Sequence, residues 1–333
     1  MRPIRRTAPA LIAVSVLMLA ACGGDDEGGG GGGGGGEAAT DYPTDDITLY
    51  VPYAAGGPTD LAARTIGTCL EDEFGQTVIV ENREGASGSI GMQAMLAEDP
   101  DGYTLSLIAV PASATNPLQG EDVGYTNDDY VPIAAVTEIP SVLAVGADSE
   151  YADAEAFFEA AEENPGQLNV GVPGTTTSQA MELKRMAEEY DIELTLLPFS
   201  GNAEMTAALL GGNVDAVFIN SSQDVLSNIE AGEFTPLAVS TPESVDYIDA
   251  PPLAEVGFPE LTNSVSVFGL AAPAETPDDV VSTLEDAVST CLEKPETVEQ
   301  LGEQYVPDEF IGTEAFRSRI DEIVEVYGPI LQD

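Results

Sequence analysis

The sequence contains no histidine and no tryptophan among its 333 residues. Without imidazole the chain cannot build a Ser-His-Asp or Cys-His catalytic arrangement, and it lacks the most common ligand of zinc and copper. Carboxylate pairs could still perform acid–base chemistry, but with 59 acidic residues close pairs are expected by chance. Neither Asp45-Asp46 nor Asp128-Asp129 lies in an EF-hand pattern, so we interpret both as solvated loops. The composition favours a protein that is not an enzyme and that holds no metal or cofactor.

Basic residues are scarce throughout the chain. Ten lysines and arginines stand against 59 aspartates and glutamates, which gives a formal net charge of −49, and the two lysines are Lys184 and Lys294. A protein that binds nucleic acid needs a basic surface to displace counterions from phosphates, so nucleic acid is not an expected partner. Like charges destabilise a compact state and are screened by salt. We therefore expect a protein that works in a saline medium and gains stability as salt rises.

Long hydrophobic runs are also missing. The apolar segment at residues 10–20 follows Arg2, Arg5 and Arg6 and is too short to span a membrane as a helix. A basic start followed by a short apolar core is typical of a signal peptide, and the sequence Leu-Ala-Ala-Cys at 19–22 resembles the bacterial lipobox. We expect residues 1–21 to be a lipoprotein signal peptide and Cys22 to carry the lipid. An ordinary signal peptide with an incidental cysteine is the alternative.

Residues 22–44 are dominated by glycine and acidic side chains, with almost no side chain that could pack into a core. This composition is typical of a flexible tether, whose r.m.s. length is ~25 Å for about 18 residues. The sequence therefore predicts an extracytoplasmic folded part that is anchored to the cell membrane through its lipid.

Two cysteines remain if Cys22 is lipidated, namely Cys69 and Cys291. An exported protein sits in an oxidising compartment, so we expect these two residues to form a disulfide. Such a bond would close a long loop and stabilise the fold by a few kcal/mol, and it would place the beginning and the end of the chain in one lobe. Two separate buried thiols are the alternative.

The stretch around residue 55 has the pattern of a strand, a glycine turn and a helix start. Residues 47–53 are rich in β-branched and aromatic side chains, Gly56-Gly57-Pro58 breaks the strand, and Thr59 or Asp60 is the expected N-cap. Glycines let a ligand approach the main chain, where the first helical N–H groups and the helix dipole favour an anion. The alternative is a turn that only redirects the chain. Within the helix, Arg64 is expected to pair with Asp60.

Strands and helices alternate along the rest of the chain, which indicates an α/β fold. Strands are expected at 76–81, 103–110, 131–136, 141–145, 168–172 and 194–198, and helices at 90–97, 153–163, 179–190 and 313–327. Residues 111–117 are expected to form a small polar loop. The turn at 173–178 offers hydroxyl and N–H groups at a helix start, which favours either a second anion site or a simple cap.

Several motifs resemble the substrate-binding proteins of tripartite tricarboxylate transporters, the Bug family. They are PYAAGGPTD at 52–60, VENREGASGSIG at 80–91 and PDGYTL at 100–105, and they occur in the family's order. The resemblance implies a two-lobed, type II periplasmic-binding-protein-like α/β fold with a ligand cleft between the lobes. It places lobe 1 at 45–136 and 247–333 and lobe 2 at 137–246.

The resemblance also implies a set of ligand-binding residues along the turns that face the cleft. They are Tyr53, Ala55, Gly56, Gly57, Thr59, Asp60, Ser113, Thr115, Asn116, Thr175, Thr176, Thr177, Ser178, Gly201 and Asn220. Family members usually carry Tyr-Lys/Arg-Gly where this chain has Phe199-Ser200-Gly201. A phenol and a cation are therefore absent from this position.

The function implied by the resemblance is that of a monomeric extracytoplasmic receptor. Such a receptor captures a small organic acid, in this case a carboxylate, and delivers it to the membrane subunits of a tripartite transporter. Two other functions remain open on the sequence alone. A sensory ligand-binding protein would present its closed form to a signalling partner, and a hydrolase would turn over ester or amide substrates.

Overall fold

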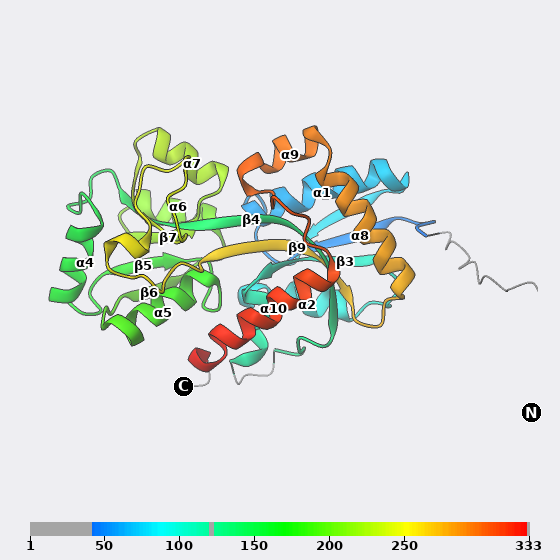
Figure 1. Cartoon of the computed structure of the whole chain (residues 1–333), viewed down its shortest axis with the longest axis horizontal. Coiled ribbons are helices and arrows are strands. Elements are labelled where there is room, and N and C mark those ends of the chain that lie inside the picture. Colours follow the sequence, from blue (N-terminus) through cyan, green and yellow to red (C-terminus); the bar gives the residue numbers. More distant parts are fainter. Residues whose placement is uncertain (1–41, 120–122, 332–333) are drawn as a thin grey trace, which may run out of the picture. The chain divides into compact units, whose positions relative to one another are not determined.

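The computed structural model describes residues 42–119 and 123–331, and these residues belong to one compact unit. The expected signal peptide, the lipidated Cys22 and most of the expected tether lie outside the described residues. The described chain forms a nine-stranded sheet with the order β2-β1-β3-β9-β4-β7-β5-β6, in which β8 pairs with β4 (Figure 1). Helices accompany strands along the whole unit, so the predicted α/β class is confirmed.

The first three strands form one end of the sheet. They are β1 (Ile47–Val51), β2 (Val78–Asn82) and β3 (Thr104–Val110), and β1 pairs in parallel with both neighbours. The helices α1 (Pro58–Phe74) and α2 (Ser89–Leu96) pack on these strands, and α8 (Asp278–Leu292) packs on α1. Ile47, Leu49 and Val51 stand at alternate positions and are fully buried, so they lie on one covered face of the sheet, while Tyr50 on the other face is also buried. We call these elements the β1–β3 side.

The other end of the sheet is formed by β5 (Asn169–Val172), β6 (Thr195–Pro198) and β7 (Ala216–Asn220), and β5 pairs in parallel with the other two. The helices here are α4 (Ala154–Glu163), α5 (Ser178–Tyr190), α6 (Asn202–Leu210) and α7 (Gln223–Glu230). Together with β8 (Phe234–Val239) they make the β5–β7 side. Figure 1 shows α4, α5 and α6 gathered around these strands.

Two long strands join the two sides. β4 (Tyr130–Gly146) pairs with β9 (Val265–Pro273) up to Pro140 and then with β7 and β8 from Ser141 onward. The prediction of two separate runs at 131–136 and 141–145 is therefore wrong. Proline has no N–H to donate to a neighbouring strand, and Pro140 lies where β4 exchanges one partner for the others. The strand continues through a residue that the sequence pattern marks as a break.

The remaining elements are short or lie near the C-terminus. They are α3 (Ala112–Thr115), α9 (Pro295–Leu301), α10 (Thr313–Tyr327) and the 3-10 turns Ala86–Gly88, Asn116–Leu118, Leu253–Val256, Glu303–Tyr305 and Pro329–Leu331. The predicted loop at 111–117 is thus a helical turn followed by a 3-10 turn. Its small residues are buried against Tyr125, and burial favours internally hydrogen-bonded backbone over an open loop.

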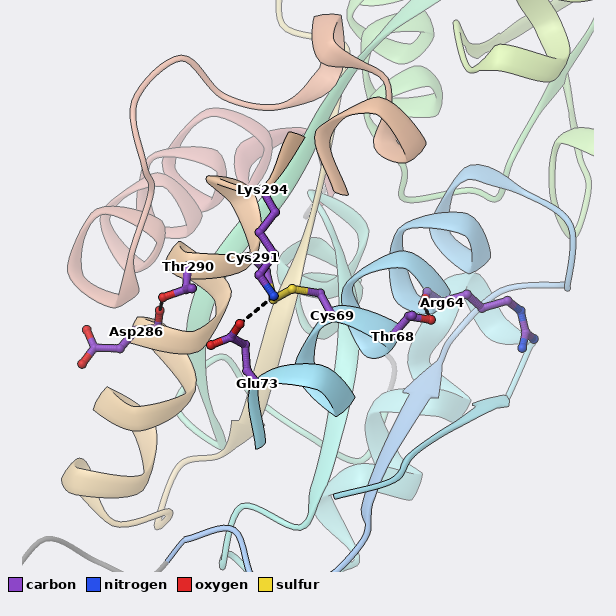
Figure 2. Close-up of a disulfide and its surroundings, with 8 residues drawn as sticks. All are labelled: Arg64, Thr68, Cys69, Glu73, Asp286, Thr290, Cys291 and Lys294. Carbon is purple, nitrogen blue, oxygen red and sulfur yellow. Dashed lines mark hydrogen bonds and ion pairs between the residues drawn. A yellow bond between two sulfur atoms is a disulfide. The ribbon is translucent and has the colours of Figure 1, made fainter. Parts of the chain in front are cut away.

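Cys69 of α1 and Cys291 of α8 form a disulfide with 5.8 Å between their Cα atoms and a sequence separation of 222. Beside it, Lys294 Nζ lies 2.6 Å from Glu73 Oε1, so an ion pair and a covalent bond join the same two parts of the chain (Figure 2). Both sulfur-bearing side chains are buried. The bond ties the early helix α1 to the late helix α8 within the β1–β3 side.

A buried polar network holds α5 against the C-terminal helix. The Tyr327 hydroxyl of α10 donates a 2.7 Å hydrogen bond to Glu182 Oε1 of α5, and Arg185 Nη1 lies 3.2 Å from the same oxygen. Burial raises the pKa of Glu182 above its usual range, although Tyr327 and Arg185 act in the opposite direction. The helix α5 is therefore fixed by charged and hydrogen-bonding groups, whereas α1 is fixed by a disulfide.

Candidate functional site

A cavity lies at the carboxyl ends of β1, β3, β5 and β7 and is lined by residues from both sides. Its volume is about 50 Å³, and about 10–15 Å³ of such volume accommodates one water molecule, so the cavity suits a small molecule. The residues that line it are Tyr53, Ala54, Ala55, Gly57, Pro58, Thr59, Ala109, Val110, Pro111, Ala112, Pro173, Thr177, Ser178, Gly201, Asn202, Ala203, Glu204, Asn220, Ser266 and Phe268.

Three helices begin at this cavity because each follows a strand of the sheet. The helices α1, α5 and α6 come after β1, β5 and β6, and the carboxyl ends of parallel strands are where ligands bind in open α/β sheets. Their N-cap residues are Gly57, Thr177 and Gly201, all of which line the cavity. The positive ends of three helix dipoles therefore converge on one small volume.

The start of α1 leaves main-chain donors uncovered. Gly57 is the N-cap without a side-chain cap, and Pro58 follows it as the first helical residue. The expectation that Thr59 or Asp60 caps the helix is wrong, because proline lacks an N–H and suits the first helical position. Within the described chain, the N–H groups of Gly57 and Thr59 have no hydrogen-bond acceptor. Both residues line the cavity, so these donors are available to an anion.

Asp60 stabilises the turn before α1 through hydrogen bonds and does not line the cavity. Its carboxylate accepts hydrogen bonds from the Gly56 N–H, from Asn82 Nδ2 and from Arg64 Nε, each at 3.0 Å. Burial raises the pKa of Asp60, but the bonds from Arg64, Gly56 and Asn82 outweigh it and hold the pKa below its usual range. The predicted pair of Asp60 with Arg64 is present at 2.9 Å, so the charge of this carboxylate is compensated at the start of α1.

Asn82 was not predicted as part of the site, although it completes the same turn. Its Nδ2 also donates a 3.0 Å hydrogen bond to the Tyr53 carbonyl, and its Oδ1 accepts one from Arg64. The motif at 80–91 indicates the family, but nothing in its pattern marks the amide of Asn82 as part of a site.

On the β5–β7 side, an amide network presents Asn220 to the cavity. Gln179 Nε2 donates a 2.7 Å hydrogen bond to Asn220 Oδ1, which leaves the Asn220 Nδ2 group without an acceptor in the described chain. Asn202 Nδ2 donates to Ser222 Oγ at 2.9 Å and is fixed by it. The amide of Asn220 is thus a further neutral donor at the cavity.

Beside the cavity, hydrogen bonds join the two sides directly. Thr115 Oγ1 donates to the Thr176 carbonyl at 2.7 Å, the Thr176 hydroxyl donates to Asn116 Oδ1, and the Thr175 N–H donates to Ser87 Oγ at 3.2 Å. Asn116 Nδ2 also donates to the Ser87 carbonyl at 3.0 Å. We call these five residues the bridging cluster. Four of them were predicted as ligand contacts, and the structure places them in contact between the sides.

The remaining predicted residues lie in or next to the cavity wall. The Tyr53 hydroxyl donates a 3.2 Å hydrogen bond to the Ser87 carbonyl, and burial raises the pKa of Tyr53. The Ser113 carbonyl accepts a 2.9 Å bond from Tyr125, whereas Ser113 Oγ is buried without a partner in the described chain. Ser113 lies outside the cavity lining.

The predicted residues that line the cavity are Tyr53, Ala55, Gly57, Thr59, Thr177, Ser178, Gly201 and Asn220, and those outside the lining are Gly56, Asp60, Ser113, Thr115, Asn116, Thr175 and Thr176. Whether each contacts ligand stays a prediction. Sequence reasoning missed Ser266 and Phe268, which reach the cavity from β9, more than 200 residues after Tyr53. No local pattern could have indicated them.

The charge of the lining is unusual for an anion site. No lysine or arginine from 42–119 or 123–331 lines the cavity, and Glu204 is the charged residue among those that do. No group of three or more metal-ligating residues occurs in the described ranges. In those ranges, no helix combines the length and the apolar character needed to cross a membrane. Recognition of an anion would therefore rest on main-chain and amide donors.

Comparison with known sequences gives a consistent result. A family profile described as the tripartite tricarboxylate transporter family receptor matches residues 62–332. The chain is 32% identical over 266 residues to the UPF0065 protein in the tcbD-tcbE intergenic region of Pseudomonas sp. strain P51, covering 78% of this chain and 77% of that one. It is 30% identical over 271 residues to protein BugT of Bordetella pertussis, with 80% and 82% covered.

Comparison with solved structures supports the same fold. A structure described as a periplasmic transporter is 31% identical, with a TM-score of 0.81 over 88% of this chain and 98% of the other. The adipate complex of Rpa4515 from R. palustris is 27% identical, with a TM-score of 0.79 over 87% of this chain and 97% of the other. The predicted periplasmic-binding-protein-like fold is confirmed by these similarities.

Proposed function

Since the chain belongs to the tripartite tricarboxylate transporter receptor family, we propose that its cavity captures a small organic acid as the carboxylate anion and that the protein delivers it to the transporter's membrane subunits. The observation that carries this proposal is the convergence of three helix starts on one small cavity. Unpaired N–H groups and helix dipoles favour a negative group there without any basic side chain. Rpa4515 is described with adipate, which is also a carboxylate, in that case a dicarboxylate.

The proposed binding event closes two lobes on the ligand. Lobe 1 would comprise 45–136 and 247–333, and lobe 2 would comprise 137–246. Supporting this division, the cavity is lined by both the β1–β3 and the β5–β7 sides, and the bridging cluster joins those sides next to it. Ligand contacts to both lobes exist only in the closed state, so binding shifts the population towards closure.

The proposal includes the location and the state of the protein. A lipid on Cys22 and a flexible tether over 22–44 would hold a monomeric receptor at the outer face of the cell membrane, with residues 1–21 removed as a signal peptide. The receptor would perform no catalysis and need no cofactor. The support for these points is the lipobox-like sequence, the glycine-rich composition and the absence of histidine.

A thermal-shift screen tests the proposal. The mature protein is measured with mono-, di- and tricarboxylates, amino acids and aromatic acids at low and high NaCl, with an external dye because the chain has no tryptophan. A ligand present at about 100 times its Kd should stabilise the protein by ~2.7 kcal/mol and raise the Tm by several degrees. One acid class that stands out supports the proposal. A well-folded protein that no acid stabilises would contradict it.

A further inference from the structure

The three helix starts at the cavity differ in how their first-turn acids are compensated. In α1 the acid is Asp60, which is paired with Arg64 at 2.9 Å. The first turn of α5 has no acid. In α6 the acid is Glu204, which lines the cavity and has no ion-pair partner in the described chain. The partial positive charge at the N-terminus of α6 is therefore offset by the Glu204 carboxylate. At α1 the acid is neutralised by Arg64, and at α5 the first turn has no acid, so neither N-terminus is offset in this way.

The backbone holds the Glu204 carboxylate near this position. Its Oε2 accepts a 3.1 Å hydrogen bond from the Ser200 N–H, the residue before the N-cap Gly201. This is the arrangement by which an acid in the first turn folds back over the start of its helix. Glu204 is exposed, so this bond holds its carboxylate at the solvent-facing α6 rim of the cavity.

Part of the remaining lining is apolar, and the space is small. Val110, Ala203 and Phe268 contribute hydrocarbon surface, and the cavity volume is about 50 Å³. A second carboxylate on a ligand would find no cation in this lining. It would lose its hydration near a like charge, and both effects disfavour burial of an anion.

On these grounds, and resting on the proposed function, we propose that the ligand is a compact monocarboxylate whose remainder carries no second carboxylate. Its carboxylate binds at the starts of α1 and α5, its remainder lies towards Phe268 and α6, and Glu204 is the residue that rejects a second carboxylate. Rejection by a like charge is a common way to obtain specificity, because it weakens the wrong ligand without strengthening the right one.

Matched acid pairs test this proposal by calorimetry with the intact mature protein. Each pair keeps the carbon count and replaces a methyl group by a carboxylate: butyrate with succinate, 2-hydroxybutyrate with malate, and hexanoate with adipate. We expect the monocarboxylate of at least one pair to bind, and its partner to bind about tenfold more weakly or worse, which corresponds to about 1.4 kcal/mol. A dicarboxylate that binds as tightly as its partner or more tightly would overturn the proposal while leaving carboxylate binding intact.

The variant Glu204→Gln isolates the role of the charge. Glutamine retains an oxygen that can accept the bond from Ser200, so the helix start is preserved, and the preference within each pair should fall to about threefold or less. The control is Glu155→Gln, which removes an exposed first-turn acid from α4, away from the cavity lining. This control should keep the full preference. An unchanged preference in Glu204→Gln would show that Glu204 does not select. Binding of none of these six acids would overturn this inference, and the proposed function falls with it only if no acid of the thermal-shift screen stabilises the protein.

Discussion

The helices α1 and α5 begin at the same cavity but differ in how their first N–H groups are capped. At α1 the N-cap Gly57 has no side chain, and the donors remain uncovered. At α5 the N-cap Thr177 accepts the Ala180 N–H through its own hydroxyl at 3.4 Å. A glycine cap costs helix stability but exposes the backbone, whereas a threonine cap stabilises the helix and occupies a donor. The comparison indicates that α1 offers more uncovered N–H donors to an anion, whereas the first turn of α5 is partly capped by its own side chain.

The two helices also differ in how their other contacts fix them. The Cys69–Cys291 disulfide bonds α1 to α8, while Glu182 of α5 lies between Arg185 and Tyr327. The disulfide stabilises the fold largely by restricting the unfolded chain, so its contribution does not depend on how the start of α1 is capped.

The largest effect is expected when the anchor of α1 is removed. The double variant Cys69→Ala, Cys291→Ala should lower the free energy of unfolding by about 2–5 kcal/mol, because a long loop is no longer closed in the unfolded chain. Denaturant titration checks this, and carboxylate binding measured well below the midpoint should persist. Wild-type protein treated with reductant should show the same loss. Unchanged stability would mean that the ion pair of Lys294 with Glu73 and the packing of α8 suffice to hold α1.

The next largest effect is expected from Gly57→Asp. A Cβ at Gly57 would meet one atom within 4 Å, the Ala54 carbonyl oxygen at 3.8 Å, and the backbone φ is −90°, so an aspartate fits without strain. Aspartate is a favourable N-cap and should preserve or slightly raise the Tm. Its charge and its bond to the first N–H groups should weaken acid binding by about 100-fold or more, or ~2.7 kcal/mol.

The matched control for this variant is Gly146→Asp. A Cβ at Gly146 likewise meets one atom within 4 Å, the Leu209 carbonyl oxygen at 3.8 Å, and Gly146 does not line the cavity. Calorimetry should show full affinity for the control. If Gly57→Asp also binds the acid with full affinity, the uncovered donors of α1 are not the anion site. The difference in capping between α1 and α5 would then have no role in ligand binding.

A smaller effect is expected from Thr177→Ala, which removes the hydroxyl that caps the N-terminus of α5. Loss of an N-cap hydroxyl should reduce the free energy of unfolding by about 0.5–1 kcal/mol, since the bond to Ala180 is long. Acid binding should change by less than about threefold, because the main-chain donors of α5 remain in place. Thr177→Ser retains the hydroxyl and should match the wild type. Affinity lost by tenfold or more in the alanine variant alone would make the hydroxyl itself a ligand group.

The smallest effect is a difference in pH dependence between the acids of the two helices. The pKa of Asp60 is lowered, so its contribution to stability is present above its ordinary value of 3.8 and is lost as pH falls through the folded-state pKa. The pKa of Glu182 is raised, so its contribution is present below its ordinary value of 4.5 and declines as pH rises towards the folded-state pKa. Urea titrations from pH 3 to 7 on Asp60→Asn and Glu182→Gln should differ from wild type in opposite pH directions. A common direction would contradict this assignment.

The local signals in the sequence were sufficient for much of this architecture. The alternation of strands and helices, the glycine turn before α1, the pair of Asp60 with Arg64 and the hydroxyl turn before α5 all depend on residues within a few positions of one another. Interactions of this range are set by backbone geometry and side-chain spacing, so a single sequence reveals them. The prediction of Thr59 or Asp60 as the N-cap is wrong because Pro58 takes the first helical position, which makes Gly57 the N-cap.

The sequence by itself determined that an acidic α/β chain without histidine would present open helix starts, because composition and turn chemistry are local properties. Only the tertiary structure decided which of these starts meet, that Thr115, Asn116, Thr175 and Thr176 contact one another, and that β4 runs unbroken through Pro140. It also brought Phe268 and Glu204 to one small cavity without a cation. Such contacts join residues far apart in the chain, and their free energy comes from packing and sheet pairing that no short segment encodes.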